Sequence, residues 1–128
     1  MSLKTINSLF LKNKPAFCTI ITESYKPFAR TLFQSIRKYD SNVDCFALVI
    51  DSKNVESSED FEYLNLECFL DFNILFKTIF YKYKLKPDEL RWSLKPALII
   101  YLIEQLKFQQ VFFVDPDLFF YRDFSFLY

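Results

Sequence analysis

Residues 111–121 constrain the fold of this chain more than any other segment, because an apolar run leads directly into two carboxylates. Four strand-favouring residues, 111–114, precede Asp115 and Asp117, and apolar residues follow the pair. A short apolar run of this kind is typical of a strand buried on both faces of a parallel sheet. Open α/β sheets bind their ligands beyond the carboxyl ends of such strands. We therefore expect Asp115 and Asp117 at the ligand-binding edge of a sheet.

The two carboxylates have the chemistry of a site for a hard divalent cation. Alternate side chains of extended backbone point the same way, and Pro116 biases Asp115 towards the extended region. Oxygen donors without His or Cys nearby suit Mg²⁺ or Mn²⁺ better than zinc, and such an ion keeps positions for waters and substrate phosphates. The pattern fits a solvated turn after a core strand equally well, so the residues alone leave both interpretations open.

The composition excludes several classes of function. The 128 residues contain no His and no Gly. Imidazole catalysis, imidazole metal ligation, a P-loop and the dinucleotide-binding glycine fingerprint are therefore excluded. Sixteen basic and sixteen acidic residues balance without a basic block, which speaks against a nucleic-acid groove. The length and a hydrophobic content of 52% predict one domain with one core.

The cysteines and the apolar runs indicate the cellular compartment in which the protein works. Cys18, Cys45 and Cys68 lie among apolar neighbours without metal-ligand spacing, and we expect buried free thiols in a reducing compartment. The longest apolar run, 97–103, is far shorter than the ~20 residues of a spanning helix, and residues 1–11 are too short an apolar stretch for a signal peptide. We expect a cytoplasmic protein, and the high aromatic content leaves contact with a membrane surface open.

Strand and helix patterns alternate along the chain, which predicts an α/β fold with a mainly parallel sheet and flanking helices. The expected strands are residues 17–22, 45–50, 61–64 and 111–114. The first expected helix begins near Pro27 and ends near residue 40. Further helices are expected over 67–84, 86–95 and 97–107, with a break or kink at Pro96. A short lead-in helix before Pro15 and an acidic loop at 56–60 complete the pattern. Residues expected on the buried face of the first helix are Phe28, Leu32, Phe33 and Ile36.

Three segments resemble parts of a known family. Residues 16–25 resemble a first strand and the loop that cups a nucleotide. Residues 88–96 contain Glu-Leu, four residues and Lys-Pro, which resembles a helix that precedes the metal motif. Residues 111–123 resemble the Asp-x-Asp strand itself. Together they make the chain similar to the N-terminal half of GT-A-type glycosyltransferases, and this resemblance implies a Rossmann-like fold that binds a nucleoside diphosphate sugar.

The resemblance implies a phosphate and metal site. Asp115 would approach the ribose or the metal, and Asp117 would ligate the Mn²⁺ or Mg²⁺ that bridges the diphosphate. Lys95 would face the diphosphate or the donor sugar, with a surface lysine as the alternative. Arg91 is a further phosphate candidate, and a solvated helix residue is an equal interpretation.

The resemblance also implies contacts to the nucleoside. Thr22 and Tyr25 would contact the base and the ribose, although Tyr25 fits a packed loop aromatic equally well. Asp51 ends the second strand, where an acid of the family can meet base or ribose; a helix cap or a turn is the alternative. We expect Trp92 in the core rather than in a stacking role.

Members of the family continue beyond the metal motif with a half that carries the acceptor pocket, most sugar contacts and any catalytic base. We therefore interpret residues 1–128 as a single nucleotide-sugar-binding domain without the acceptor half, and assign no catalytic residue. Transfer would need the missing half or an oligomer partner, and the aromatic tail at 124–128 would have nothing to pack against. Rival interpretations are a non-catalytic nucleotide-binding or scaffold protein and a haloacid-dehalogenase-type phosphatase.

Overall fold

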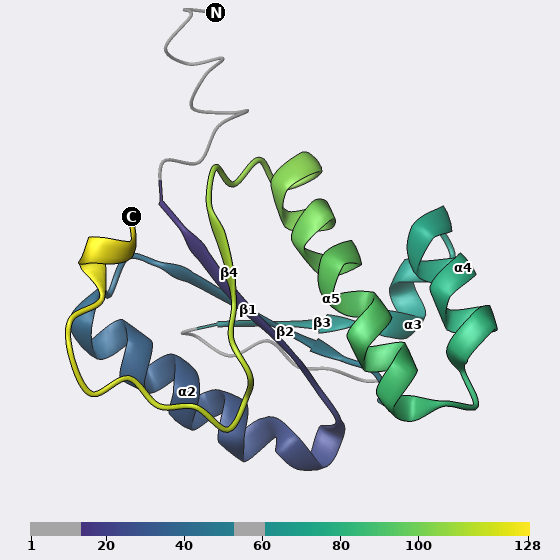
Figure 1. Cartoon of the computed structure of the whole chain (residues 1–128), viewed down its shortest axis with the longest axis horizontal. Coiled ribbons are helices and arrows are strands. Elements are labelled where there is room, and N and C mark those ends of the chain that lie inside the picture. The colour runs from purple at the N-terminus through teal and green to yellow at the C-terminus, as the bar shows by residue number, and fades with distance from the viewer. Residues whose placement is uncertain (1–13, 53–60) are drawn as a thin grey trace, which may run out of the picture.

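The computed structural model describes residues 14–52 and 61–128, which form a four-stranded parallel sheet with helices on both faces (Figure 1). Its strands are β1 (Ala16–Ile21), β2 (Asp44–Val49), β3 (Glu62–Asn65) and β4 (Val111–Phe113). Neighbouring strands are parallel throughout, in the order β3-β2-β1-β4. The predicted α/β, Rossmann-like fold is confirmed. The predicted lead-in helix and acidic loop fall largely outside the described residues.

The position of β1 inside the sheet creates a reversal in the strand order. Ala16 lies opposite Asp44 of β2 on one side and opposite Val111 of β4 on the other. The chain passes outward from β1 to β2 and β3, and then returns across the sheet to place β4 against the free side of β1. The carboxyl ends of β1 and β4 therefore form a topological switch point, where open α/β sheets bind ligands.

Helix α2 (Lys26–Tyr39) covers one face of the sheet (Figure 1). It begins with a proline in its first turn and buries Leu32, Phe33 and Ile36 completely, so the amphipathic pattern predicted its core face. The prediction for Phe28 is wrong, because the buried stripe begins at Ala29. Phe28 lies at the edge of that stripe and packs on Tyr25, with 5.1 Å between the ring centroids.

The other face is covered by α3 (Leu66–Phe69), α4 (Ile74–Tyr83) and α5 (Pro87–Glu104). The single helix predicted over 67–84 is wrong, because a turn separates α3 from α4. The Asn73 side chain accepts hydrogen bonds from Leu75 N and Phe76 N, both at 3.1 Å, and so caps the start of α4. Asn is a strong capping residue, and Asn73 was the signal for this boundary.

Pro96 does not break α5, which continues from Pro87 to Glu104. A proline inside a helix removes the hydrogen bond to the carbonyl four residues earlier, here that of Trp92. Both residues are exposed, so water can satisfy that carbonyl and the helix persists. The two predicted helices on either side of Pro96 are therefore one element, which brings residues 91, 95 and 98 into one rigid body.

Strand β4 is an edge strand among those described, although we predicted a strand buried on both faces inside the sheet. Its three residues are half-buried, and only Val114 beyond it is buried. The chain then crosses α2, where Phe120 N donates to Ser35 Oγ at 3.0 Å. Phe124 is buried against Phe17 with ring centroids 5.2 Å apart, so the prediction of an unpacked tail is wrong at Phe124, although Phe126 is exposed.

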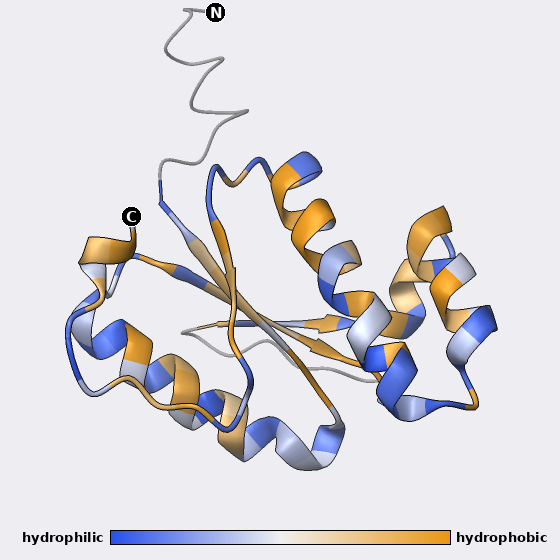
Figure 2. Ribbon diagram, viewed as in Figure 1, coloured by the Kyte–Doolittle hydropathy of each residue, from blue (hydrophilic) through white to orange (hydrophobic). Residues whose placement is uncertain are grey.

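Figure 2 shows apolar residues concentrated along the strands and on the helix faces turned to the sheet. Cys18 and Cys45 are buried there, and burial raises the pKa of each thiol to about 12. Both are therefore neutral thiols near neutral pH. Cys68 is exposed, contrary to prediction, because it lies within the short α3 between Leu66 and Phe69, the two residues that this helix buries. In the described part of the chain, no helix has the length and apolar character required to cross a bilayer.

Candidate functional site

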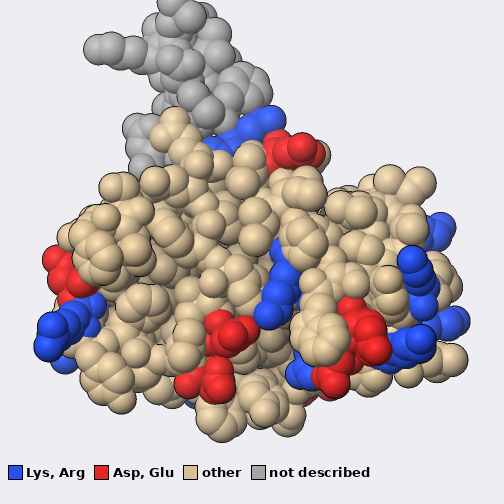
Figure 3. Space-filling view, in the orientation of Figure 1, with Lys and Arg blue, Asp and Glu red and all other residues tan. Residues whose placement is uncertain are grey.

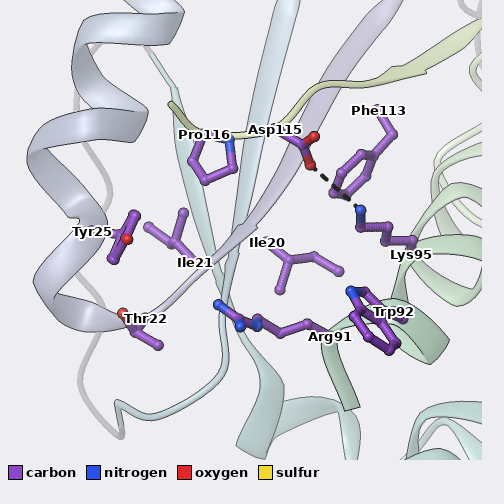
Figure 4. Close-up of a pocket in the computed structure, with 10 residues that line it drawn as sticks. All are labelled: Ile20, Ile21, Thr22, Tyr25, Arg91, Trp92, Lys95, Phe113, Asp115 and Pro116. Atoms are coloured by element: carbon purple, nitrogen blue, oxygen red, sulfur yellow. Dashed lines mark hydrogen bonds and ion pairs between the residues drawn. The ribbon is translucent and has the colours of Figure 1, made fainter. Parts of the chain in front are cut away.

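A cavity of about 130 Å³ opens at the carboxyl ends of β1 and β4. This is the switch point of the sheet. Figure 4 shows that its walls come from three segments that are far apart in sequence. The lining residues are Ile20, Ile21, Thr22 and Tyr25 from the end of β1 and the loop after it, Arg91, Trp92 and Lys95 on α5, and Phe113, Asp115 and Pro116 from the end of β4 and the turn after it.

The structure brings together five of the seven residues predicted for the site and leaves two outside the cavity. Asp51 and Asp117 do not line it. The five that meet there are Thr22, Tyr25, Arg91, Lys95 and Asp115.

Lys95 connects α5 to the end of β4. Its Nζ lies 3.4 Å from Asp115 Oδ1 and 4.8 Å from the centroid of the Phe113 ring (Figure 4). Both charged side chains are partly exposed, and ion pairs of this kind contribute only about 0–1 kcal/mol. An incoming anion can therefore replace Asp115 as the partner of the Lys95 ammonium group at a small cost in free energy, so Lys95 is available to a ligand.

Arg91 precedes Lys95 by one helical turn, and both side chains consequently reach the same cavity. Arg91 also forms an ion pair with Asp88 on the first turn of α5. Figure 4 shows its guanidinium group extending from α5 towards the β1 side of the cavity. Each cation thus has one exposed carboxylate partner, Asp88 for Arg91 and Asp115 for Lys95, and an anionic ligand would replace these carboxylates.

The loop after β1 is fixed by polar contacts outside the cavity. Asp51 Oδ1 accepts a hydrogen bond of 2.7 Å from Glu23 N, and Thr22 Oγ1 lies 3.0 Å from Ser24 Oγ. Lys26 Nζ lies 2.6 Å from Glu23 Oε1, and this hydrogen bond lowers the pKa of the Glu23 carboxyl. Asp51 thus ties the end of β2 to the loop that carries Thr22, which is a positioning contact rather than a place in the cavity wall.

The backbone at the two adjacent carboxylates is a turn, and the predicted extended geometry is wrong there. Leu118 N donates to Asp115 O at 3.2 Å, which places Pro116 and Asp117 at the two central positions. Proline is favoured at the first central position of such turns because its φ is already fixed. The turn directs Asp115 to the cavity and leaves Asp117 exposed outside the lining.

The donors nevertheless suit a Mg²⁺-type ion. Asp115 and Asp117 are exposed carboxylates one residue apart, and an ion of this kind needs only one or two protein carboxylates when phosphates and water complete its shell. Among the described residues, no group of three or more His, Cys, Asp or Glu is arranged to hold a metal.

Sequence reasoning missed Trp92 and Phe113 as parts of the site. Trp92 was expected in the core, but it is 63% exposed and lines the cavity. The available signal was its position three residues before Lys95, which puts both on one side of α5.

No family model, curated protein or solved structure matches this chain. The function of the site therefore rests on its own geometry and chemistry.

Proposed function

We propose that the cavity binds the diphosphate group of a nucleoside diphosphate sugar, as part of a glycosyltransferase. One observation supports this most strongly. Five residues selected from the sequence for such a ligand, on three separate segments, line one cavity at the switch point of a parallel sheet. Ligands of open α/β sheets bind at that place.

The volume of the cavity limits which part of the ligand it would hold. Pockets that enclose a whole drug-sized ligand measure roughly 300–1,000 Å³, whereas this one measures about 130 Å³. We therefore assign the diphosphate to the cavity, next to Arg91 and Lys95. The base and ribose would lie over the loop of Thr22 and Tyr25, with Trp92 offering a second exposed aromatic face.

The chemical contribution of these residues would be electrostatic. Breaking the bond between sugar and diphosphate develops negative charge on the leaving group, and cations already in place stabilise it. Lys95 would exchange its contact with Asp115 for a phosphate oxygen. Asp115, with Asp117 in the adjoining turn, would hold Mn²⁺ or Mg²⁺. Such an ion, when bound, would neutralise further charge on the diphosphate.

Transfer to an acceptor needs groups beyond those lining this cavity, and we assign no catalytic base. We propose that a second half or a partner subunit supplies the acceptor site. We also propose that the protein works in the cytoplasm, because Cys18 and Cys45 are buried as free thiols and free thiols are typical of reducing compartments.

In the experiment, the purified chain is titrated with UDP and GDP, with and without Mn²⁺, and binding is measured by calorimetry and by fluorescence. Trp92 is the only tryptophan, so its emission reports directly on the cavity. We expect Mn²⁺-dependent binding that Asp115→Asn abolishes and Asp117→Asn weakens less. Asp123→Asn is the matched control, because Asp123 is exposed, accepts hydrogen bonds from Ser125 and lies outside the cavity lining.

Two results would contradict the proposal. One is the absence of any nucleoside diphosphate binding by the folded chain, which would favour the scaffold interpretation. The other is equal Mn²⁺-dependent affinity in the wild type and in Asp115→Asn.

A further inference from the structure

The solvent side of α4 and the turn after it are unusually apolar. Ile74 is 82% exposed and Leu85 is 87% exposed, and Tyr81 between them is exposed as well. Ile74 and Tyr81 are seven residues apart, about two helical turns, so they lie on the same side of the helix. Only Phe76 of this helix is fully buried. The exposed residues therefore form a stripe that the core does not use.

Lysines flank this stripe without acidic partners. Residues 72–87 contain four lysines and no Asp or Glu, and Lys77 and Lys82 fall on opposite flanks of the stripe by helical geometry. None of the ion pairs found among residues 14–52 and 61–128 involves any of the four. The four lysines are Lys77, Lys82, Lys84 and Lys86, and all four are exposed.

Figure 3 shows Lys and Arg side chains gathered along the edge of the molecule where α4 lies in Figure 1. Two of them rest on tyrosine rings: Lys82 Nζ lies 5.2 Å from the Tyr83 centroid, and Lys84 Nζ lies 5.3 Å from that of Tyr81. Acidic residues lie at the borders of the patch: Glu67 and Asp71 line one groove together with Lys77, and two more occupy the first turn of α5. The patch itself thus combines exposed apolar groups with lysines, and the acidic residues lie only around it.

We propose that α4 and the turn to residue 86 bind the surface of a membrane that contains anionic lipids. Apolar side chains on such a helix enter the boundary between headgroups and acyl chains, and flanking lysines extend to the lipid phosphates. The helix would lie on the bilayer rather than cross it. This inference does not depend on the proposed nucleotide site.

Charge favours a membrane over other occupants of the patch. In a second copy docked symmetrically on the same surface, the two sets of lysines would face each other, because the acidic residues lie at the borders of the patch and not within it. A nucleic acid would pair with the lysines but would leave Ile74 and Leu85 exposed. An anionic bilayer satisfies the lysines and the apolar stripe together.

The test is sedimentation of the full chain with phosphatidylcholine vesicles, with and without added phosphatidylglycerol. We expect binding only to the anionic vesicles, weakened by added salt. Each lysine near such a surface contributes about a five-fold increase in partitioning. Changing all four to Gln should therefore reduce binding on the order of several hundred-fold. Ile74→Ser with Leu85→Ser should reduce it as well, through the apolar contribution.

The matched control removes four exposed cations from elsewhere on the protein, namely Arg30, Lys38, Lys107 and Arg122, each replaced by Gln. It should retain most of the binding. Thermal unfolding verifies that every variant is folded. Equal binding by the α4 variant and the wild type, or an equal loss in the control, would overturn the proposal. So would a chain that binds no vesicles but dimerises through Ile74 and Leu85, as measured by light scattering.

Discussion

Helices α2 and α4 pack on opposite faces of the same sheet, yet they use their apolar residues in different ways. In α2 the stripe of Leu32, Phe33 and Ile36 is completely buried, and Phe28 in the first turn is exposed. In α4 only Phe76 is buried, and Ile74 and Tyr81 face solvent. The comparison teaches that folding alone explains the apolar stripe of α2. The α4 sequence contains apolar surface that folding does not require, and that surplus is the basis for a surface interaction.

Truncation of one large apolar residue in each helix gives the largest expected difference. Phe33→Ala removes a fully buried ring and should lower the free energy of unfolding by about 3–5 kcal/mol. Ile74→Ala removes an exposed side chain and should change it by no more than about 0.5 kcal/mol. Urea unfolding measures both. Similar losses in the two variants would show that α4 is anchored through its outer side.

The second prediction concerns alkaline pH and the buried thiols between the two helix layers. Burial raises the pKa of Cys18 and Cys45 from 9.0 to about 12. Above pH 9 the unfolded chain therefore loses these protons while the folded chain keeps them, so stability falls as pH rises towards 12. At pH 10 the loss is about 1.4 kcal/mol for each thiol.

Unfolding curves at pH 8 to 10 check this effect by their slope rather than by their absolute values. Replacing Cys18 and Cys45 by Ala should flatten the decline, whereas Cys68→Ala, at an exposed thiol, should leave it unchanged. An identical decline in all three proteins would assign it to other groups.

The smallest of these effects concerns the start of α4. Asn73→Ala removes the cap on Leu75 N and Phe76 N and should cost about 1 kcal/mol. Helix α2 has no side-chain cap at its start. Asn42→Ala, in the loop after α2, serves as the control and should leave the free energy of unfolding nearly unchanged. A loss of stability at Asn42 as large as that at Asn73 would remove this distinction.

The same contrast explains which parts of the fold could be predicted. The amphipathic period of α2 and the continuous apolar runs of β1 and β2 determine those elements locally, and the prediction agreed with the structure. Helix α4 is apolar on several sides, so periodicity could not separate it from α3, and Asn73 was overlooked. Whether β4 lies at an edge depends on strand pairing, which no local pattern encodes.

The site could be predicted from sequence to a similar extent. The strand end selected Asp115 from the residue pattern, whereas Thr22 and Lys95 were selected through the family resemblance; all three line the cavity. The exposure of Trp92 depends on how α5 lies on the sheet, and the orientation of Asp117 depends on a turn. Both are tertiary properties that the residue pattern left open.

The central claim, that the cavity binds a diphosphate, is tested most directly at Lys95. Calorimetry should compare UDP with uridine for the wild type, for Lys95→Ala and for Lys38→Ala, which removes an exposed lysine on the α2 side. We predict that Lys95→Ala weakens UDP binding by about 1–3 kcal/mol, the scale of a lost hydrogen bond to a charged group, and leaves uridine binding unchanged. Lys38→Ala should bind both like the wild type. Equal UDP affinity in the wild type and in Lys95→Ala would contradict the account.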